Sequence, residues 1–273
     1  MKVGIIQMPV SADKEENLIY ARREILKAAE LGAQVAVLPE MFCNPYENRA
    51  FTEYAEHEGG RIYSAMRDAA RDAGVYLVAG SFPERSGDRI YNSSYVFSPE
   101  CERHIVHFRK MHLFDIDVKG GQSFRESDTL SAGDSIAVFD TPWGRCGVCI
   151  CFDIRFPELA RLYALNGVNV LFVPAAFNMT TGPAHWELTM RARALDNQLY
   201  VVACAPARDT KASYVSYANS LVASAWGDIK YRAGEGAETL VCDLDMQEAE
   251  KIRAELPLLS ARRCDLYDLK FKY

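Results

Sequence analysis

Apolar residues in the first half of the chain form short unbroken runs and longer runs with helical spacing. The unbroken runs predict buried strands at Val3–Met8, Val35–Leu38 and Val75–Ala79. A fourth strand, Tyr91–Phe97, is predicted after a turn at 86–88. Apolar residues spaced three and four apart predict amphipathic helices over Asp13–Leu31 and Arg61–Ala73. The polar, glycine-containing stretch from about His104 to Gly133 is predicted to be a long functional loop.

The same order of elements then begins again. Strands are predicted at Gly147–Ile150, Val170–Val173, Tyr200–Ala203 and Ser220–Ala223, and helices at Glu158–Leu165 and Trp186–Asn197. The two halves also align residue by residue, and the matching segments are 29–42 with 164–177, 75–79 with 199–203, and Asn92-Ser93 with Asn219-Ser220. This pattern indicates a single internal duplication rather than an array of repeats.

Each half therefore predicts a β-α-β-α-β-β unit that contains one mostly buried sheet. Two such sheets packed face to face, with helices outside, make an α/β fold that is a four-layer α-β-β-α sandwich with an internal pseudo-two-fold repeat. No low-complexity linker separates the halves, so we expect one domain over residues 1–273.

Composition narrows the class of protein. Of the 273 residues, 49% are apolar and 25% are charged, as in ordinary globular proteins. No apolar run approaches the roughly 18 residues of a membrane span, and the first residues lack the features of a signal peptide. The net charge of −6 argues against a nucleic-acid partner. The 8 scattered cysteines, without a secretory signal, predict reduced thiols and a cytoplasmic location, with no membrane partner.

The stretch 145–158 predicts a strand, a tight turn and a helix, with Cys151 at the turn. A nucleophile placed there is exposed at the carboxyl end of the strand, beside backbone N–H groups that can hold negative charge. Two other interpretations stay open. Cys151 can be a core cysteine, which suits Cys149 and Cys204, or a metal ligand with Cys146 and Cys149. Strand alternation places Cys146 and Cys149 on opposite faces, and no second Cys/His pair with zinc-finger spacing follows.

Two further residues carry potential chemistry. Glu40 ends a buried strand, whereas the aligned position of the second half holds Ala175, so the fold itself does not require a carboxylate there. Glu40 is either a structural ion-pair partner or a general base whose pKa burial raises. Lys110 lies among apolar residues that can draw it inward, and His112 is predicted to be a structural hydrogen-bonding residue. A cysteine needs a nearby base or cation in order to act as a nucleophile at neutral pH, and a carboxylate with a lysine supplies both.

Together these segments resemble the nitrilase, or carbon–nitrogen hydrolase, superfamily. The resemblance is carried by Leu38–Phe42, Phe108–Phe114 and Gly147–Glu158, in the family's order of Glu, Lys and Cys, and it extends over nearly the whole chain. It implies the same four-layer fold. It also implies that Glu40 is the general base and that Cys151 forms a thioester with the acyl group. Lys110 and the backbone N–H of Phe152 would hold the oxyanion, Glu126 would be the second family glutamate, and no metal or cofactor would be needed.

The finer resemblance is to the ω-amidase branch, through the segments 112–117, 177–187 and 206–214. It implies a small-molecule amide substrate with a 2-oxo acid at its far end, such as 2-oxoglutaramate or 2-oxosuccinamate. The substrate carboxylate then needs a clamp. Arg155, four residues after Cys151, is the first candidate, because related amidases use that position for substrate carboxylates and guanidinium geometry suits a carboxylate. Its alternative is an ion pair with Asp153 or Glu158.

Tyr46, Asn178 and Thr181 are further candidates for substrate binding, because they follow equivalent strand ends of the two halves. His185 and Trp186 are predicted to be structural. One departure from the family pattern occurs at 218–220, where a Gly-His-Ser-like triplet is usual and this chain has Ala-Asn-Ser. The hydrogen bonding around Asn219 is therefore left open.

Other functions remain compatible with the sequence. Within the superfamily these are a deaminated-glutathione amidase, an N-carbamoyl hydrolase and a true nitrilase. Outside it, they are a non-catalytic binding protein of the same fold and a thiol redox or metal protein built on Cys146 and Cys149. The family usually dimerises, so we expect a homodimer or higher homo-oligomer. The apolar residues of the C-terminal segment are candidates to reach a partner, namely Leu256, Leu258, Leu259, Leu266, Tyr267 and Leu269.

Overall fold

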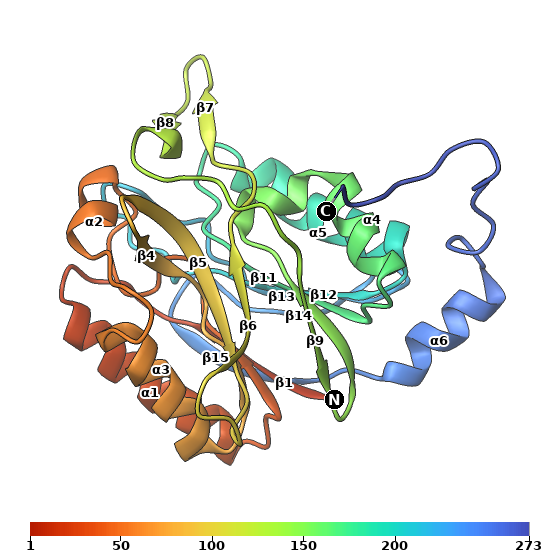
Figure 1. Cartoon of the computed structure of the whole chain (residues 1–273), viewed down its shortest axis with the longest axis horizontal. Coiled ribbons are helices and arrows are strands. Elements are labelled where there is room, and N and C mark those ends of the chain that lie inside the picture. The colour runs from red at the N-terminus through yellow and green to blue at the C-terminus, as the bar shows by residue number, and fades with distance from the viewer. Residues whose placement is uncertain (273) are drawn as a thin grey trace.

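Two large β-sheets lie face to face in the computed structural model of the chain, which describes residues 1–272 (Figure 1). The first sheet follows the order β15 (Glu238–Asp243), β1 (Lys2–Gln7), β2 (Val35–Val37), β3 (Tyr76–Val78), β5 (Arg89–Phe97) and β4 (Phe82–Ser86), and β6 (His104–Arg109) also pairs with β5. The second follows the order β14 (Ile229–Arg232), β13 (Leu221–Ala223), β12 (Tyr200–Cys204), β11 (Val170–Pro174), β10 (Gly144–Val148) and β9 (Ala137–Thr141).

Helices cover the outer faces of both sheets. Helices α1 (Lys14–Glu30) and α3 (Arg61–Ala73) pack on the first sheet, and α4 (Pro157–Leu165) and α5 (Gly182–Asn197) pack on the second (Figure 1). The layers therefore run helix, sheet, sheet, helix, which confirms the predicted four-layer sandwich. In each half the three central strands are parallel, β1–β2–β3 in the first and β10–β11–β12 in the second.

Strand β1 shows how the sequence builds these layers. Val3 and Ile5 are fully buried against the second sheet, whereas Gly4 faces helix α1. A Cβ atom on Gly4 would lie 2.9 Å from the Cβ of Ala28, so the glycine lets the helix approach the sheet closely. Burying an aliphatic side chain of this size contributes about 1.5–3 kcal/mol, and both faces of the parallel strands are buried in this way.

The prediction of a loop over 104–133 is partly wrong. This stretch contains β6, the short hairpin of β7 (Asp115–Asp117) and β8 (Ser123–Arg125), and a 3-10 turn at Glu126–Asp128. The signal for β6 is weak because polar residues interrupt its apolar ones without regular alternation, at His104, His107 and Arg109. Its polar residues His107 and Arg109 are held by the buried carboxylate of Glu84 on β4, a non-local contact.

Other elements were not predicted. These are α2 (Asn48–Glu53), β4, β9, β14, β15 and α6 (Met246–Glu255). Strand β15 pairs antiparallel with β1, so the C-terminal half completes the sheet of the N-terminal half.

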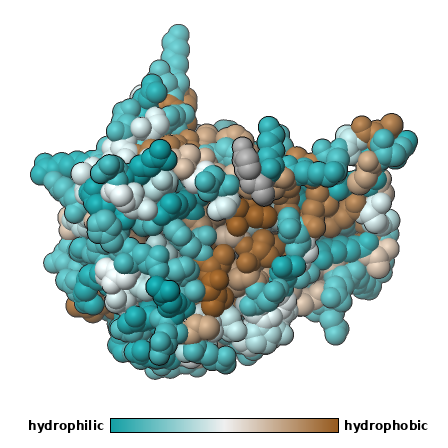
Figure 2. Space-filling view, in the orientation of Figure 1, coloured by the Kyte–Doolittle hydropathy of each residue, from teal (hydrophilic) through white to brown (hydrophobic). Residues whose placement is uncertain are grey.

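Figure 2 shows apolar side chains gathered over the middle of one face, where β6 and β9 lie in Figure 1. Half-buried residues in and next to these two strands extend the core between the sheets, namely Ile105, Val106, Ile136 and Val138. Among residues 1–272, no helix has the length and apolar character that crossing a membrane requires.

Candidate active site

Cys151 lies at a sharp turn between strand β10 and helix α4. The strand ends at Val148, and a 3-10 turn over Cys151–Arg155 follows. The φ angle of Cys151 is +48°, in the left-handed region that costs a non-glycine residue about 1–2 kcal/mol. The side chain is buried, and its Sγ accepts a hydrogen bond from the backbone N–H of Ala176 at 3.5 Å. The predicted strand and turn are therefore present with Cys151 at the turn, although the strand ends two residues earlier than predicted and the thiol is buried rather than exposed.

Glu40 follows the end of β2, directly before a residue with positive φ, Met41. Gly80 permits this path, because a Cβ atom there would lie 2.1 Å from the carbonyl oxygen of Pro39. The Glu40 carboxylate is buried, and its Oε1 accepts two hydrogen bonds, from Lys110 Nζ at 2.8 Å and Asn92 Nδ2 at 2.8 Å, and lies 3.1 Å from Tyr46 OH. Its Oε2 has no hydrogen-bond partner among residues 1–272. One oxygen is thus held in place and the other is available.

Lys110 and Glu126 complete a fully buried group of charges. Lys110 follows the end of β6, and its Nζ contacts Glu40 Oε1 at 2.8 Å and Glu126 Oε1 at 2.9 Å. Its third donor faces the hydroxyl oxygen of Tyr46 at 3.4 Å. Glu126 is held from its other side, because Oε2 accepts the backbone N–H of Phe114 at 2.7 Å. The predicted inward position of Lys110 is present, and the ammonium lies between two carboxylates.

The electrostatics of this group favour a protonated thiol at Cys151 beside the carboxyl group of Glu40. Burial raises the pKa of Cys151 well above its usual value, the charge of Glu40 adds to this, and Lys110 opposes it. Burial likewise raises the pKa of Glu40, against the ammonium of Lys110 and together with the charge of Glu126. Burial lowers the pKa of Lys110, but the charges of Glu126 and Glu40 outweigh it and keep the ammonium protonated. Cys151 is therefore a protonated thiol in the resting site.

Arg155 lies at the end of the 3-10 turn that begins at Cys151. Its guanidinium stacks over the Phe177 ring at 4.4 Å, and its Nη1 lies 3.0 Å from His185 Nδ1. Burial lowers the pKa of Arg155, and the two groups that oppose this shift, Cys151 and Tyr214, are neutral in the resting site. Neither predicted ion-pair partner is used, since Asp153 bonds His112 instead and no ion pair forms with Glu158 within the described residues.

The other substrate-binding candidates have polar atoms that are already engaged. The hydroxyl of Tyr46 lies between the two glutamates, 2.6 Å from Glu126 Oε1. Asn178 Nδ2 donates to the side chain of Gln122, and its Oδ1 accepts the N–H of Thr181 at 2.9 Å, just before helix α5. Trp186 is buried as predicted, whereas His185 contacts Arg155. Tyr46, Asn178 and Thr181 all remain predictions as substrate ligands.

Two residues at the site were not predicted. Asn92 donates to Glu40, and its only sequence signal was its alignment with Asn219 in the duplication. Tyr214 stacks on Tyr46 with ring centroids 4.4 Å apart, and its hydroxyl donates to the carbonyl of Ala176 at 2.5 Å. Its signal was its place in the 206–214 segment that resembles the ω-amidase branch.

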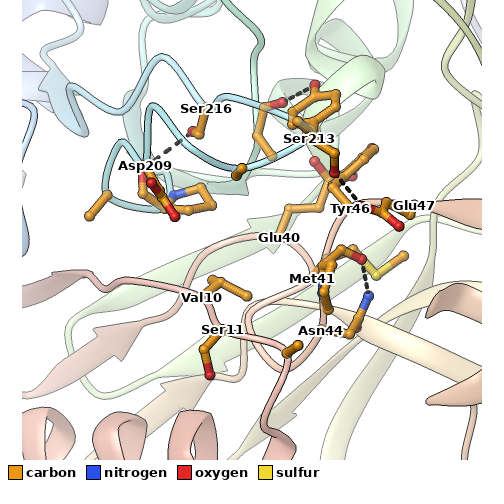
Figure 3. Close-up of a pocket in the computed structure, with 17 residues that line it drawn as sticks. Val10, Ser11, Glu40, Met41, Asn44, Tyr46, Glu47, Asp209, Ser213 and Ser216 are labelled. Atoms are coloured by element: carbon orange, nitrogen blue, oxygen red, sulfur yellow. Dashed lines mark hydrogen bonds between the residues drawn. The ribbon is translucent and has the colours of Figure 1, made fainter.

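A cavity of about 260 Å³ reaches Glu40 from the molecular surface (Figure 3). Figure 3 shows Asp209, Ser213 and Ser216 on one side of it and Val10 and Ser11 on the other. The described residues contain no group of three or more His, Cys, Asp and Glu side chains placed to hold a metal ion.

Comparison with known proteins decides the family. The sequence model described as carbon-nitrogen hydrolase matches residues 2–254. The chain belongs to the carbon-nitrogen hydrolase family. The resemblance found in the sequence is therefore confirmed, and this hydrolase is also similar to curated omega-amidases. Omega-amidase NIT2-A of Xenopus laevis is 48% identical over 99% of the chain and 98% of the relative, and omega-amidase NIT2 of Homo sapiens is 44% identical over the same shares.

A solved structure confirms the fold of this carbon-nitrogen hydrolase. Saccharomyces cerevisiae Nit3, described as a member of branch 10 of the nitrilase superfamily, superposes with a TM-score of 0.87. The two chains are 37% identical, and the superposition covers 96% of each.

Asn219 departs from the family pattern, but its polar side-chain atoms are hydrogen-bonded. Nδ2 donates to Tyr217 O at 2.7 Å, and Oδ1 accepts from Arg232 at 3.3 Å.

Proposed function

We propose that this hydrolase is an ω-amidase that converts the monoamides of small 2-oxo dicarboxylic acids, such as 2-oxoglutaramate and 2-oxosuccinamate, into the 2-oxo acid and ammonia. One observation carries the substrate class. Arg155 is a half-buried cation near the Cys151 thiol that has no carboxylate partner among residues 1–272. A substrate carboxylate supplies that partner, and the similar proteins are named omega-amidases.

In the first step Glu40 takes the proton of the Cys151 thiol, and the thiolate attacks the amide carbon. The free Oε2 of Glu40 is the oxygen available to accept this proton. A carboxylate whose pKa is raised by burial is a stronger base than an exposed one, which suits proton transfer near neutral pH. The carbonyl oxygen becomes an oxyanion, and the amide nitrogen stays attached to the tetrahedral carbon.

The oxyanion is held by Lys110 and by the backbone N–H of Phe152. All three donors of Lys110 have acceptors in the resting site, and the longest contact, 3.4 Å to the Tyr46 hydroxyl, is the weakest. We infer that this donor turns to the oxyanion while the bonds to Glu40 and Glu126 stay. Donors of this kind contribute about 3–4 kcal/mol each to lowering the barrier.

The tetrahedral intermediate then collapses and its C–N bond breaks. Glu40 returns its proton to the leaving nitrogen, so ammonia departs and the acyl group remains on Cys151 as a thioester. In the second step Glu40 takes a proton from water, and the hydroxide attacks the thioester through a second oxyanion. The C–S bond breaks, the carboxylic acid leaves, and the thiol regains its proton. Tyr46 and Glu126 act as positioning residues, because both hold the Glu40–Lys110 pair.

Ammonia release from matched amides tests this function. The wild-type enzyme is expected to hydrolyse 2-oxoglutaramate, and to lose most of that activity on an amide in which a methyl group replaces the carboxylate. Arg155→Gln is expected to raise KM for 2-oxoglutaramate about 10- to 100-fold, because a hydrogen bond to a charged group contributes about 1.5–3 kcal/mol. Arg161→Gln, which alters another half-buried arginine, is the control. An unchanged KM in Arg155→Gln places the clamp elsewhere.

Cys151→Ala tests the nucleophile. We expect no ammonia release and a nearly unchanged free energy of unfolding. Cys149→Ala is the matched control, because Cys149 is buried two residues earlier and is expected to retain activity. Full activity in Cys151→Ala contradicts the thioester route. A panel that includes N-carbamoyl amino acids and larger amides separates the ω-amidase from other activities of the superfamily.

A further inference from the structure

The side chain of Asp153 joins the turn that carries Cys151 to the segment that carries Lys110. Asp153 is fully buried, and its carboxylate accepts three hydrogen bonds. Oδ2 accepts the backbone N–H of Ile150 at 3.1 Å. Oδ1 accepts both the backbone N–H of His112 at 2.9 Å and the ring Nδ1–H of His112 at 2.7 Å. One carboxylate therefore bonds two segments about forty residues apart in the sequence.

On the Cys151 side, these bonds close the turn around the nucleophile. Besides the side-chain bond, the backbone N–H of Asp153 donates to the carbonyl of Ile150 at 3.1 Å. Cys151 lies between these two residues with its φ of +48°. A strained conformation of this kind persists only where the surroundings determine it, and the paired bonds of Ile150 and Asp153 do so here.

On the Lys110 side, a single residue separates the lysine from His112. The backbone of Lys110 is bonded at both ends, since its N–H donates to Asn92 O at 2.9 Å and its carbonyl accepts from Gly133 N at 2.8 Å. The His112 ring stacks on Phe156, with centroids 3.7 Å apart and an interplanar angle of 13°. The ring thus has two contacts that variants can separate, the hydrogen bond to Asp153 and the stack on Phe156.

We propose that His112 and Asp153 form a positioning pair that sets the Lys110 ammonium relative to the Cys151 thiol. The proposal rests on the roles proposed above for Lys110 and Cys151. Both oxygens of Asp153 are occupied by His112 and Ile150, so the pair acts through the residues it holds and does not bond the substrate. Misplacing reacting groups by about 1 Å costs about 100-fold in rate, so a loose pair is expected to slow the chemistry more than it weakens binding.

Two substitutions of His112 give opposite expectations. His112→Asn keeps an N–H close to the position of Nδ1 and loses the stack, whereas His112→Phe keeps the stack and loses the N–H. We expect His112→Phe to lower kcat for 2-oxoglutaramate by about 10- to 100-fold with KM little changed, and His112→Asn to retain kcat within about threefold. If packing on Phe156 is what matters, the order of the two variants reverses and the proposal is overturned.

Alkylation of Cys151 by iodoacetamide gives a readout that does not depend on the substrate. The rate is followed on the peptide that contains Cys151, because Cys101 and Cys264 are exposed and also react. We expect slower alkylation in His112→Phe and a rate close to that of the wild type in His112→Asn. If the wild type releases no ammonia from any ω-amide while this pattern holds, the proposed substrate fails and the pair stands. Equal alkylation in both variants overturns the pair.

Asp153→Asn tests the same pair from the other side. An asparagine offers one acceptor oxygen, so it can bond either His112 or Ile150 but not both. We expect a fall in kcat similar to that of His112→Phe, again with little change in KM. The control is His104→Phe, which alters a half-buried histidine at the other end of β6 and is expected to leave kcat unchanged. A normal kcat in a folded Asp153→Asn enzyme contradicts the proposal. This test does not depend on whether His112→Phe folds.

Discussion

Replacing Glu126 by glutamine removes one negative charge from the buried site with almost no change in shape. Oε1 of Glu126 accepts from Lys110 at 2.9 Å and from Tyr46 at 2.6 Å, and Oε2 accepts the N–H of Phe114 at 2.7 Å. A glutamine side chain has one acceptor oxygen and one NH₂ group. In either orientation the NH₂ group faces a donor, so at least one buried hydrogen bond is lost together with the charge.

The cost in stability follows from these contacts. Removing one partner of a buried ion pair costs about 3–5 kcal/mol. Lys110 keeps its second carboxylate, Glu40, at 2.8 Å, so we expect the lower end of that range, about 3 kcal/mol in the free energy of unfolding. Urea denaturation measures this change. Glu24→Gln is the matched control, because Glu24 is also buried and paired but lies on helix α1, away from the site.

The activity of Glu126→Gln has its own pH signature. The charge of Glu126 raises the pKa of Glu40, so removing that charge lowers the pKa of Glu40. The base then stays ionised to lower pH, and the acid limb of kcat/KM is expected to move to lower pH. At neutral pH a weaker base and a less firmly held Lys110 are expected to reduce kcat/KM about 100-fold, which corresponds to about 2.7 kcal/mol.

Urea denaturation and the pH dependence of kcat/KM together separate a loss of stability from a change at Glu40. Glu24→Gln is expected to lose stability without moving the acid limb, since no charge near Glu40 changes. If the acid limb of Glu126→Gln stays in place or moves to higher pH, the acid limb does not report Glu40, and the assignment of Glu40 as the base is refuted. If stability is unchanged, Lys110 is held by Glu40 alone.

Two further substitutions test separate parts of the molecule. Tyr46→Phe removes the hydroxyl between the two glutamates, and we expect a loss of about 1 kcal/mol in the free energy of unfolding and a lower kcat with KM little changed, measured by urea denaturation and ammonia release. Burial alone would raise the pKa of Glu84, but hydrogen bonds hold it well below its usual value of 4.5, from His107, Arg109 and Ser93. Stability from such a carboxylate is present above that usual value and is lost as pH falls below it. The difference in Tm between the wild type and Glu84→Gln is therefore expected to be large at pH 7 and to shrink below about pH 4.5.

Much of the fold was predictable because both halves repeat a strong local pattern. The parallel strands are short apolar runs, and the helices between them have apolar residues with helical spacing and clear ends, such as Asp13, which caps α1 by accepting Glu16 N–H at 3.1 Å. The sequence also indicated the candidate residues Glu40 and Cys151, since each lies at the end of a predicted buried strand. At Glu40 the duplication added an independent reason, because the equivalent strand continues into Ala175.

The missed features depend on contacts between distant segments. Strand β6 looks polar because Glu84, on β4, satisfies its histidine and arginine side chains. The pairing of β15 with β1 joins the two ends of the chain, and no local pattern indicates it. The contacts of the Tyr46 hydroxyl with glutamates 6 and 80 residues away in the sequence were likewise not indicated by any local pattern.

The duplication also explains how two aligned asparagines serve different purposes. Asn92 and Asn219 align in the two halves, and Glu40 aligns with Ala175. In the second half, where the strand end has no carboxylate, the amide of Asn219 donates to the backbone carbonyl of Tyr217. In the first half the amide of Asn92 donates to Glu40 at 2.8 Å. Aligned asparagines thus satisfy the backbone in one half and hold the proposed base in the other, so the difference in chemistry follows from the residue at the strand end.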